Sequence, residues 1–261
     1  MNIDHLVINV DKEYQTDQNI MNKINSIGLP YEPKWGKGTI GFKVSNIWIG
    51  NEYFEMIRLL RKNGGGWREE WVEQYNNSHR GIICLFIEVD DIKEEFNRLK
   101  KIGVKISEPE YLKFKWFFGL LTRTMPWQNS YLPFFQGIPF QLGFQQMKDK
   151  KSKNWMLQYM VPNSRENGIE GIIEIKIYGN YSEQDRTLIK NIFPNVLFKN
   201  NGIEVELKNG QKLTFLQEEN HHVEIYTQCK NKEYINKNVS IHNIKIINAW
   251  MKSGATSYNK R

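Results

Sequence analysis

The chain has only two cysteines among 261 residues, Cys84 and Cys229. A disulfide framework or a cysteine-rich zinc site needs more cysteines at closer spacing, so both classes are excluded. No apolar run approaches the ~18–20 residues of a membrane-spanning helix, so no membrane partner is expected. The first residues also lack the basic segment and cleavage site of a secretory signal. These absences favour a cytoplasmic protein with reduced thiols.

A clustered basic surface is missing as well. The formal net charge is +7 at pH 7, but much of the excess lies in residues 148–153 and 230–261, which are predicted to be solvated. Nucleic-acid binding requires a basic face or a recognisable motif, and the sequence has neither. We therefore expect no nucleic-acid partner. A small-molecule ligand, bound by a monomer or homodimer, is the remaining expectation.

Two strand-like segments each carry one polar residue that can bind a metal. His5 interrupts the apolar run of residues 3–10, and Glu55 interrupts that of residues 53–60. Imidazole nitrogen and carboxylate oxygen are common ligands of divalent Zn, Mn, Ni or Fe. A metal centre needs three or four ligands. The pair is therefore also compatible with two ordinary hydrogen-bonded side chains.

The hydrophobic pattern predicts a βαβββ unit at the start of the chain. A strand at residues 3–10 precedes a helix that ends at Gly28 and has a buried stripe at helical spacing: Ile20, Ile24 and Ile27. Turn residues Asn46 and Gly50 then separate three further predicted strands: 39–44, 47–50 and 53–60.

A second copy of this unit begins at Gly81. Residues 82–90 form the expected strand, and Asp91 with Glu94 is a helix-capping pair. Three less regular strands are predicted after the helix: about 104–108, 116–125 and 140–146. When the two copies are aligned on Val10-Asp11 and Val89-Asp90, Cys84 takes the position of His5.

A third, poorer copy follows a charged linker. We predict a strand at 169–178, a helix at 182–193 and strands near 203–207, 212–216 and 223–226. Asn209-Gly210 indicates a hairpin turn. One last strand at 239–247 is all that is expected of a fourth unit. The predicted class is therefore α+β, built from repeated modules.

These modules resemble the vicinal oxygen chelate superfamily, which includes glyoxalase I, extradiol dioxygenases and the fosfomycin- and bleomycin-resistance proteins. The chain is most similar to glyoxalase-like domain proteins. The likeness rests on short motifs in a fixed order: residues 3–7, 36–39, 51–57, 81–83, 89–91 and 138–140. It implies that residues 1–147 form one domain of two modules, 1–62 and 80–147, whose sheet is an open half-barrel. A linker at 148–168 and a degenerate βαβββ-like module at 169–261 would complete the chain.

In that superfamily the first and fourth strands of both modules supply the ligands of a divalent metal ion. Carried over, the resemblance assigns His5 and Glu55 to the first module. The second module offers Cys84 and Gln145, with Gln141 as the alternative to Gln145. The metal would polarise a substrate oxygen as a Lewis acid, and Glu55 would also act as the catalytic proton shuttle.

Three functions remain open at this point. The first is a metal-dependent lyase, isomerase or dioxygenase acting on a small organic molecule. The second is a metal-free binding protein of the bleomycin-resistance type, and the third is a scaffold that has lost its site. Large aromatic residues of the second module exceed what its core needs, so some of them are expected to line an apolar cavity: Trp116, Phe118, Trp127, Tyr131 and Phe135.

Overall fold

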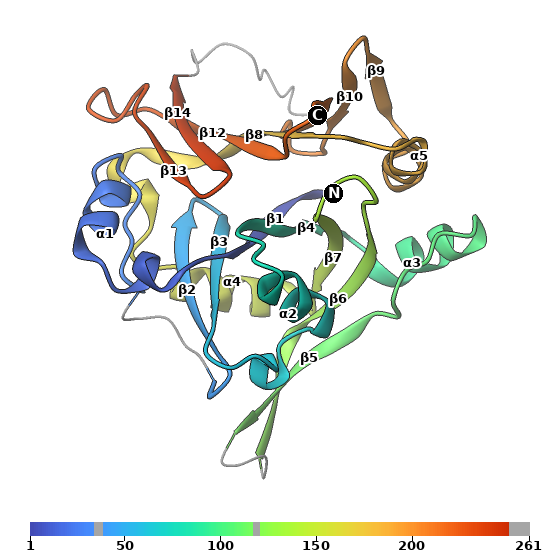
Figure 1. The fold of residues 1–261 in the computed structure, drawn as a ribbon, viewed down its shortest axis with the longest axis horizontal. Helices are drawn as coiled ribbons and strands as arrows, with labels where there is room; N and C mark the ends of the chain where they lie inside the picture. The colour runs from blue at the N-terminus through green and yellow to red at the C-terminus, as the bar shows by residue number, and fades with distance from the viewer. Residues whose placement is uncertain (34–38, 117–120, 251–261) are drawn as a thin grey trace.

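The computed structural model describes residues 1–33, 39–116 and 121–250. Its strands form two seven-stranded sheets that lie one above the other (Figure 1). The motif at 36–39, apart from Thr39, and the aromatic residue Phe118 lie outside the described residues. No described helix is long and apolar enough to cross a membrane.

The first sheet is curled into an open half-barrel and has the order β2-β3-β1-β4-β7-β6-β5. Its two central strands, β1 (Asn2–Asn9) and β4 (Gly81–Glu88), run antiparallel and begin the two modules. This order is the one that two paired βαβββ modules produce. The α+β half-barrel predicted from the sequence is therefore confirmed.

The first module differs from the prediction in one respect. After η1 (Lys12–Gln15) and α1 (Gln18–Asn25) come β2 (Phe42–Ile49) and β3 (Glu52–Leu59). The turn predicted at Asn46 is wrong, because β2 runs through it and pairs Asn46 with Glu55. An isolated bridge between Tyr31 and Ile47 stands in the place of a further strand.

The second module contains α3 (Ile92–Lys101), capped by Asp91 as predicted. Its later strands are β5 (Glu110–Trp116), β6 (Leu121–Phe134) and β7 (Gln141–Met147). The predicted strand at 104–108 is wrong, since those residues are irregular. The strand predicted at about 116–125 is wrong as well, because β5 ends at Trp116 and a separate strand, β6, begins at Leu121 and continues to Phe134. β6 contains Pro126 and Pro133, and because proline normally interrupts a sheet, the sequence pattern did not predict its full length.

Two helices outside the modules lie on the face of the first sheet that is turned away from the second sheet (Figure 1). One is α2 (Glu69–Asn76), preceded by η3 (Gly64–Gly66). The other is α4 (Lys150–Tyr159), which with η4 (Ser164–Asn167) occupies the segment expected to be a linker. The division of the chain into domains remains a prediction.

The second sheet repeats the design of the first, with order β13-β14-β12-β8-β11-β10-β9. Its complete module consists of β8 (Ile169–Gly179), α5 (Glu183–Ile192), β9 (Val196–Lys199), β10 (Gly202–Glu206) and β11 (Lys212–Gln217). A shorter partner module contains β12 (His222–Cys229), β13 (Asn238–Ile241) and β14 (Ile244–Trp250). The single strand predicted at 239–247 is wrong, because it turns at His242, whose φ is 52°.

The main core fills the space between the sheets. It joins alternate residues of β1, such as Leu6 and Ile8, to Ile175 and Ile177 of β8 and to the inner faces of the module helices. The opposite face of the first sheet is concave and carries His5 and Val7. That concave face is where the predicted site lies.

Candidate functional site

The concave face of the first sheet is organised in three rows that cross the strands. The register joins neighbouring residues on adjacent strands, so each row can be followed from one edge to the other. The polar row consists of Asn2, Glu88, Gln145, Asn129 and Glu110. The aromatic row consists of Trp48, Tyr53, His5, Phe86, Gly143 and Tyr131. The Glu55 row consists of Asn46, Glu55, Val7, Cys84, Gln141 and Phe134.

His5 lies in the middle of the aromatic row. Its imidazole is stacked between the rings of Tyr53 and Phe86, with 4.5 Å between centroids on each side, and only 4% of the residue is exposed. A register shift between Ile3 and His5 turns Asp4 toward the same face. Asp4 Oδ1 lies 2.5 Å from His5 Nδ1 and fixes the ring. A metal at this ring would have to bind Nε2.

Glu55 lies one row away from His5, on the neighbouring strand. It is half-buried, and within the described part of the chain its side-chain carboxylate forms no hydrogen bond. Burial raises the pKa of its carboxyl, an effect that nearby His5 partly offsets and Asp4 reinforces. Asn46, directly opposite on β2, has a buried Oδ1 that also lacks a partner among the described residues. These two residues therefore leave acceptors facing the concave side.

The two modules are related by the pairing of their first strands. His5 opposes Phe86 and Val7 opposes Cys84. A two-fold rotation that interchanges β1 and β4 therefore places Cys84 at the position of His5, as the sequence alignment predicted. The same exchange converts the pair Val7 and Glu55 into Phe86 and Gly143. The counterpart of Glu55 is thus Gly143, which has no side chain to offer a ligand.

Gln145 and Gln141, the two predicted alternatives, lie two residues to either side of Gly143 and have other partners. Gln145 donates its Nε2 to Asp4 Oδ1 at 2.8 Å. Gln141 accepts from Trp71 Nε1 at 2.8 Å and donates to Leu132 O. Both side-chain amides are thus hydrogen-bonded to other protein groups, and they lie on either side of Gly143, the position at which the resemblance requires a ligand.

Cys84 is fully buried beneath the segment that carries α2. Trp71 of α2, itself 3% exposed, belongs to the same apolar cluster as Cys84, Val7 and Phe86. Burial raises the pKa of the Cys84 thiol well above its ordinary value. Because the thiolate is the form that binds metals, this environment opposes ligation.

The predicted donors therefore fit only half of a metal centre. His5 and Glu55 lie on neighbouring strands, but Cys84 is covered and Gly143 offers nothing. Within the described residues there is no group of three or more His, Cys, Asp and Glu side chains arranged to hold a metal ion.

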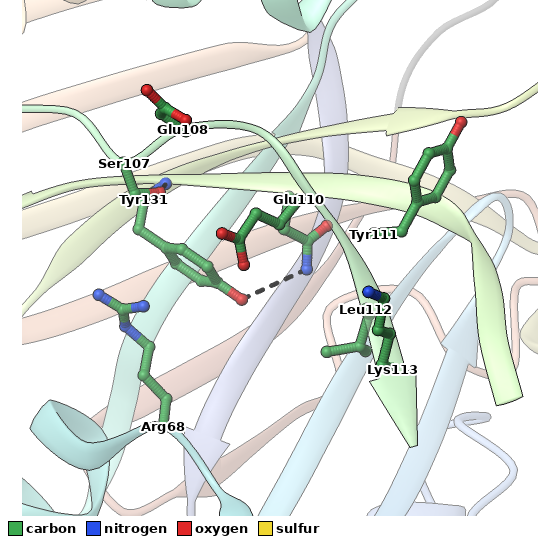
Figure 2. A pocket seen from close by; sticks show the side chains of 9 residues that line it. Arg68, Ser107, Glu108, Glu110, Tyr111, Leu112, Lys113 and Tyr131 are labelled. Atoms are coloured by element: carbon green, nitrogen blue, oxygen red, sulfur yellow. Dashed lines mark hydrogen bonds between the residues drawn. The ribbon is translucent and has the colours of Figure 1, made fainter. Parts of the chain in front are cut away.

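A cavity of about 620 Å³ opens on the same face, beside β5 and β6 (Figure 2). Figure 2 shows Arg68, Tyr131 and Glu110 turned toward one another, with Tyr111 further along the wall. The Arg68 guanidinium lies 3.9 Å from the centroid of the Tyr131 ring and donates to Glu70 at 2.8 Å. Asn129 Nδ2 lies 3.5 Å from Tyr131 Oη. Tyr131 is thus one of the predicted aromatic residues that line a cavity.

Two polar atoms at this cavity are buried without a partner in the described residues, Arg68 Nε and Asn129 Oδ1. The sequence analysis missed both residues, as well as Glu110. Arg68 lies between the two predicted modules, 1–62 and 80–147, and Asn129 lies beyond the predicted end of its strand. Extending that strand through Pro126 would have placed Asn129 and Tyr131 on one face.

Comparisons with known proteins support the fold alone. No family model and no curated protein matches the sequence. A hypothetical protein from Staphylococcus aureus aligns with 96% of this chain and 99% of its own, at 12% identity and a TM-score of 0.70. Methylmalonyl-CoA epimerases from Streptomyces coelicolor and Mycobacterium tuberculosis align with 57% and 58% of this chain and 99% and 91% of theirs, at 11% and 12% identity. Their TM-scores are 0.40 and 0.38.

The strand order and the first of these alignments show a fold of paired βαβββ modules arranged in two sheets. The alignment with the Staphylococcus aureus protein spans both sheets, so the two-sheet arrangement recurs in a solved structure. The epimerase alignments are too weak to carry an argument about chemistry.

Proposed function

We propose that this protein binds a small polar organic molecule on the concave face of its first sheet, without a metal ion. The observation that carries the proposal is the cavity in which Arg68 and Asn129 present buried polar atoms that no described residue satisfies. Buried polar atoms in folded proteins nearly always have a partner. A bound ligand would supply the two that are missing here.

The chemistry of the two atoms defines the ligand. Arg68 Nε is a charged donor and calls for an acceptor, best a carboxylate. Asn129 Oδ1 is an acceptor and calls for a hydroxyl or N–H donor. The Tyr131 ring offers a flat apolar wall between them. A hydroxy acid, an amino acid or a related carboxamide satisfies all three, and a volume of about 620 Å³ is within the usual range for such sites.

A metal-dependent enzyme is the second candidate. It is favoured by the contact between Asp4 and His5, because a carboxylate that orients an imidazole is the usual neighbour of a metal-bound histidine. Glu55 would be both ligand and catalytic base in that case, whereas Cys84 and Gln145, the partners that the resemblance implies, are respectively covered and bonded to Asp4. It ranks second because the counterpart of Glu55 is a glycine.

Ligand-observed NMR with L-malate, L-glutamine, 4-hydroxybenzoate and nicotinamide tests the first proposal. We expect at least one of these probes to bind in the presence of EDTA, and Arg68→Met and Asn129→Leu each to weaken it about tenfold or more, the usual effect of losing a charged or buried hydrogen bond. Arg61→Met, a change at an exposed arginine in the same segment, is the matched control and should have no effect.

The proposal fails if no probe binds. It also fails if a probe binds with the same affinity to the wild type, Arg68→Met and Asn129→Leu. Binding that requires a divalent metal and is lost in His5→Ala would instead support the second candidate.

A further inference from the structure

A second, smaller cavity lies on the same concave face, between the first sheet and α4. Its volume is about 240 Å³, and it shares no described lining residue with the larger cavity. Three members of the polar row, Asn2, Glu88 and Gln145, form part of its wall together with Asp4. It is therefore a separate site, at the other end of the polar row.

The polar wall of this cavity offers acceptors. Gln145 is 4% exposed, and because Asp4 can only accept, its amide must turn Nε2 toward Asp4 and Oε1 away from it. That Oε1 is buried and has no partner among the described residues, and the same is true of Asn2 Oδ1. Two carbonyl oxygens beside a carboxylate thus lack a donor.

The wall of this cavity carries more carboxylates than cations among its described residues. Asp4 and Glu88 contribute carboxylates, whereas Lys153 of α4 is the one cation among the described residues of the wall. Lys153 Nζ lies 2.5 Å from Glu88 Oε1 and neutralises it. Glu52, also in the wall, accepts from Ile172 N and from Gln211 Nε2. Within the described residues, Asp4 therefore has no compensating cation other than the imidazole it orients.

The opposite wall is apolar and flexible. α4 contributes Met156 and Leu157, Met160 follows at its end, and Met147 and Trp127 come from β7 and β6. Unbranched methionine side chains adapt to the shape of an alkyl group. The indole of Trp127 can also stabilise a nearby cation. The cavity thus has an acceptor-rich end and a hydrocarbon end.

We propose that this cavity binds a small organic ammonium ion of the primary alkylamine class. An ammonium group supplies three donors, which match Asp4, Gln145 Oε1 and Asn2 Oδ1. Its alkyl chain would lie against the methionines of the α4 side. The volume admits about eight water-sized groups at ~30 Å³ each, so a chain of about six carbons fits. This ligand is of opposite charge to the one proposed for Arg68.

Calorimetric titration with n-hexylammonium chloride at pH 7.5 tests the proposal, with n-hexanol and hexanoate as neutral and anionic analogues. We expect saturable binding of one hexylammonium ion, and binding of either analogue at least about tenfold weaker, since a charge-assisted hydrogen bond is lost. Asp4→Asn and Gln145→Met should each weaken hexylammonium about tenfold or more. Asp90→Asn, at an exposed aspartate paired with Lys208, is the matched control and should leave binding unchanged.

The analogue comparison uses the wild-type protein, so it stands even if a variant fails to fold. Equal binding of hexanol and hexylammonium would overturn the proposal, because it would show an apolar cavity without ammonium recognition. Absence of saturable hexylammonium binding would overturn it as well, as would unchanged affinity in folded Asp4→Asn and Gln145→Met.

Discussion

The ring of Phe86 occupies the space into which a side chain at Gly143 would project. A Cβ atom built on Gly143 would lie 2.6 Å from Phe86 Cε1, well inside van der Waals contact. Phe86 in turn stacks on His5. The position at which a side chain would complete a metal centre in the second module is thus filled by the Phe86 ring. That ring stacks on His5 of the first module.

Replacing Gly143 by alanine should destabilise the protein through this contact. Overpacking a filled interior costs about 1–3 kcal/mol, and we expect a loss of that size for Gly143→Ala in urea denaturation. In a Phe86→Ala background the same change should cost much less, because the space is then free. Equal cost in both backgrounds would show that Phe86 is not the obstacle.

The hydrogen bond from Trp71 to Gln141 ties α2 to the concave face. Trp71→Phe keeps most of the ring but leaves Gln141 Oε1 buried without its donor, so it should lower the free energy of unfolding by about 1–3 kcal/mol. Trp250→Phe, at a tryptophan that is 51% exposed, is the control and should change it little. If the two variants are equally stable, α2 is not held by this bond.

Glu52 makes stability fall as the pH rises. It is buried at the wall of the smaller cavity, and burial raises its pKa from 4.5 to about 7 despite hydrogen bonds from Ile172 and Gln211. Between those values the unfolded chain ionises first, so about 3 kcal/mol of stability is lost on going from pH 4.5 to 7. Glu52→Gln should remove this loss in urea denaturation at pH 5 and 8, whereas the exposed control Glu206→Gln should retain it.

His79 has the opposite effect. Burial, with the nearby His221, Arg80 and His242, lowers its pKa from 6.5 to about 4. The unfolded chain takes up the proton first, so stability is fully present above pH 6.5 and is lost as the pH falls toward 4. In His79→Gln the free energy of unfolding should therefore fall less between pH 6.5 and 4 than it does in the wild type. The partly exposed control His222→Gln should show the same fall as the wild type. A wild-type-like acid transition in His79→Gln would contradict this assignment.

Much of the fold could be predicted because it repeats. The apolar runs at residues 3–10 and 82–90 predicted β1 and β4, and alignment of the modules predicted the correspondence of His5 and Cys84. The boundaries failed where local signals misled. Asparagine is common in turns, but Asn46 lies within a strand and faces the concave side. His242 forms a tight turn although histidine is not a typical turn residue.

The site was less predictable because it depends on contacts between distant residues. His5 and Glu55 were found from single residues in apolar strands. The role of Gly143 follows only from strand register, and Arg68 reaches its cavity only because α2 folds back over the sheet. No spacing in the sequence shows that Trp71 covers Cys84.

We propose that the concave face binds its ligand without a metal ion. Elemental analysis of protein purified without chelator, then equilibrated with Zn, Mn, Ni or Fe(II) and desalted, tests it most directly, with the His5→Ala/Glu55→Gln double variant treated in parallel. Our account predicts well under one equivalent of metal in the wild type and no difference from the double variant. One equivalent of metal in the wild type that is lost in the double variant would contradict it.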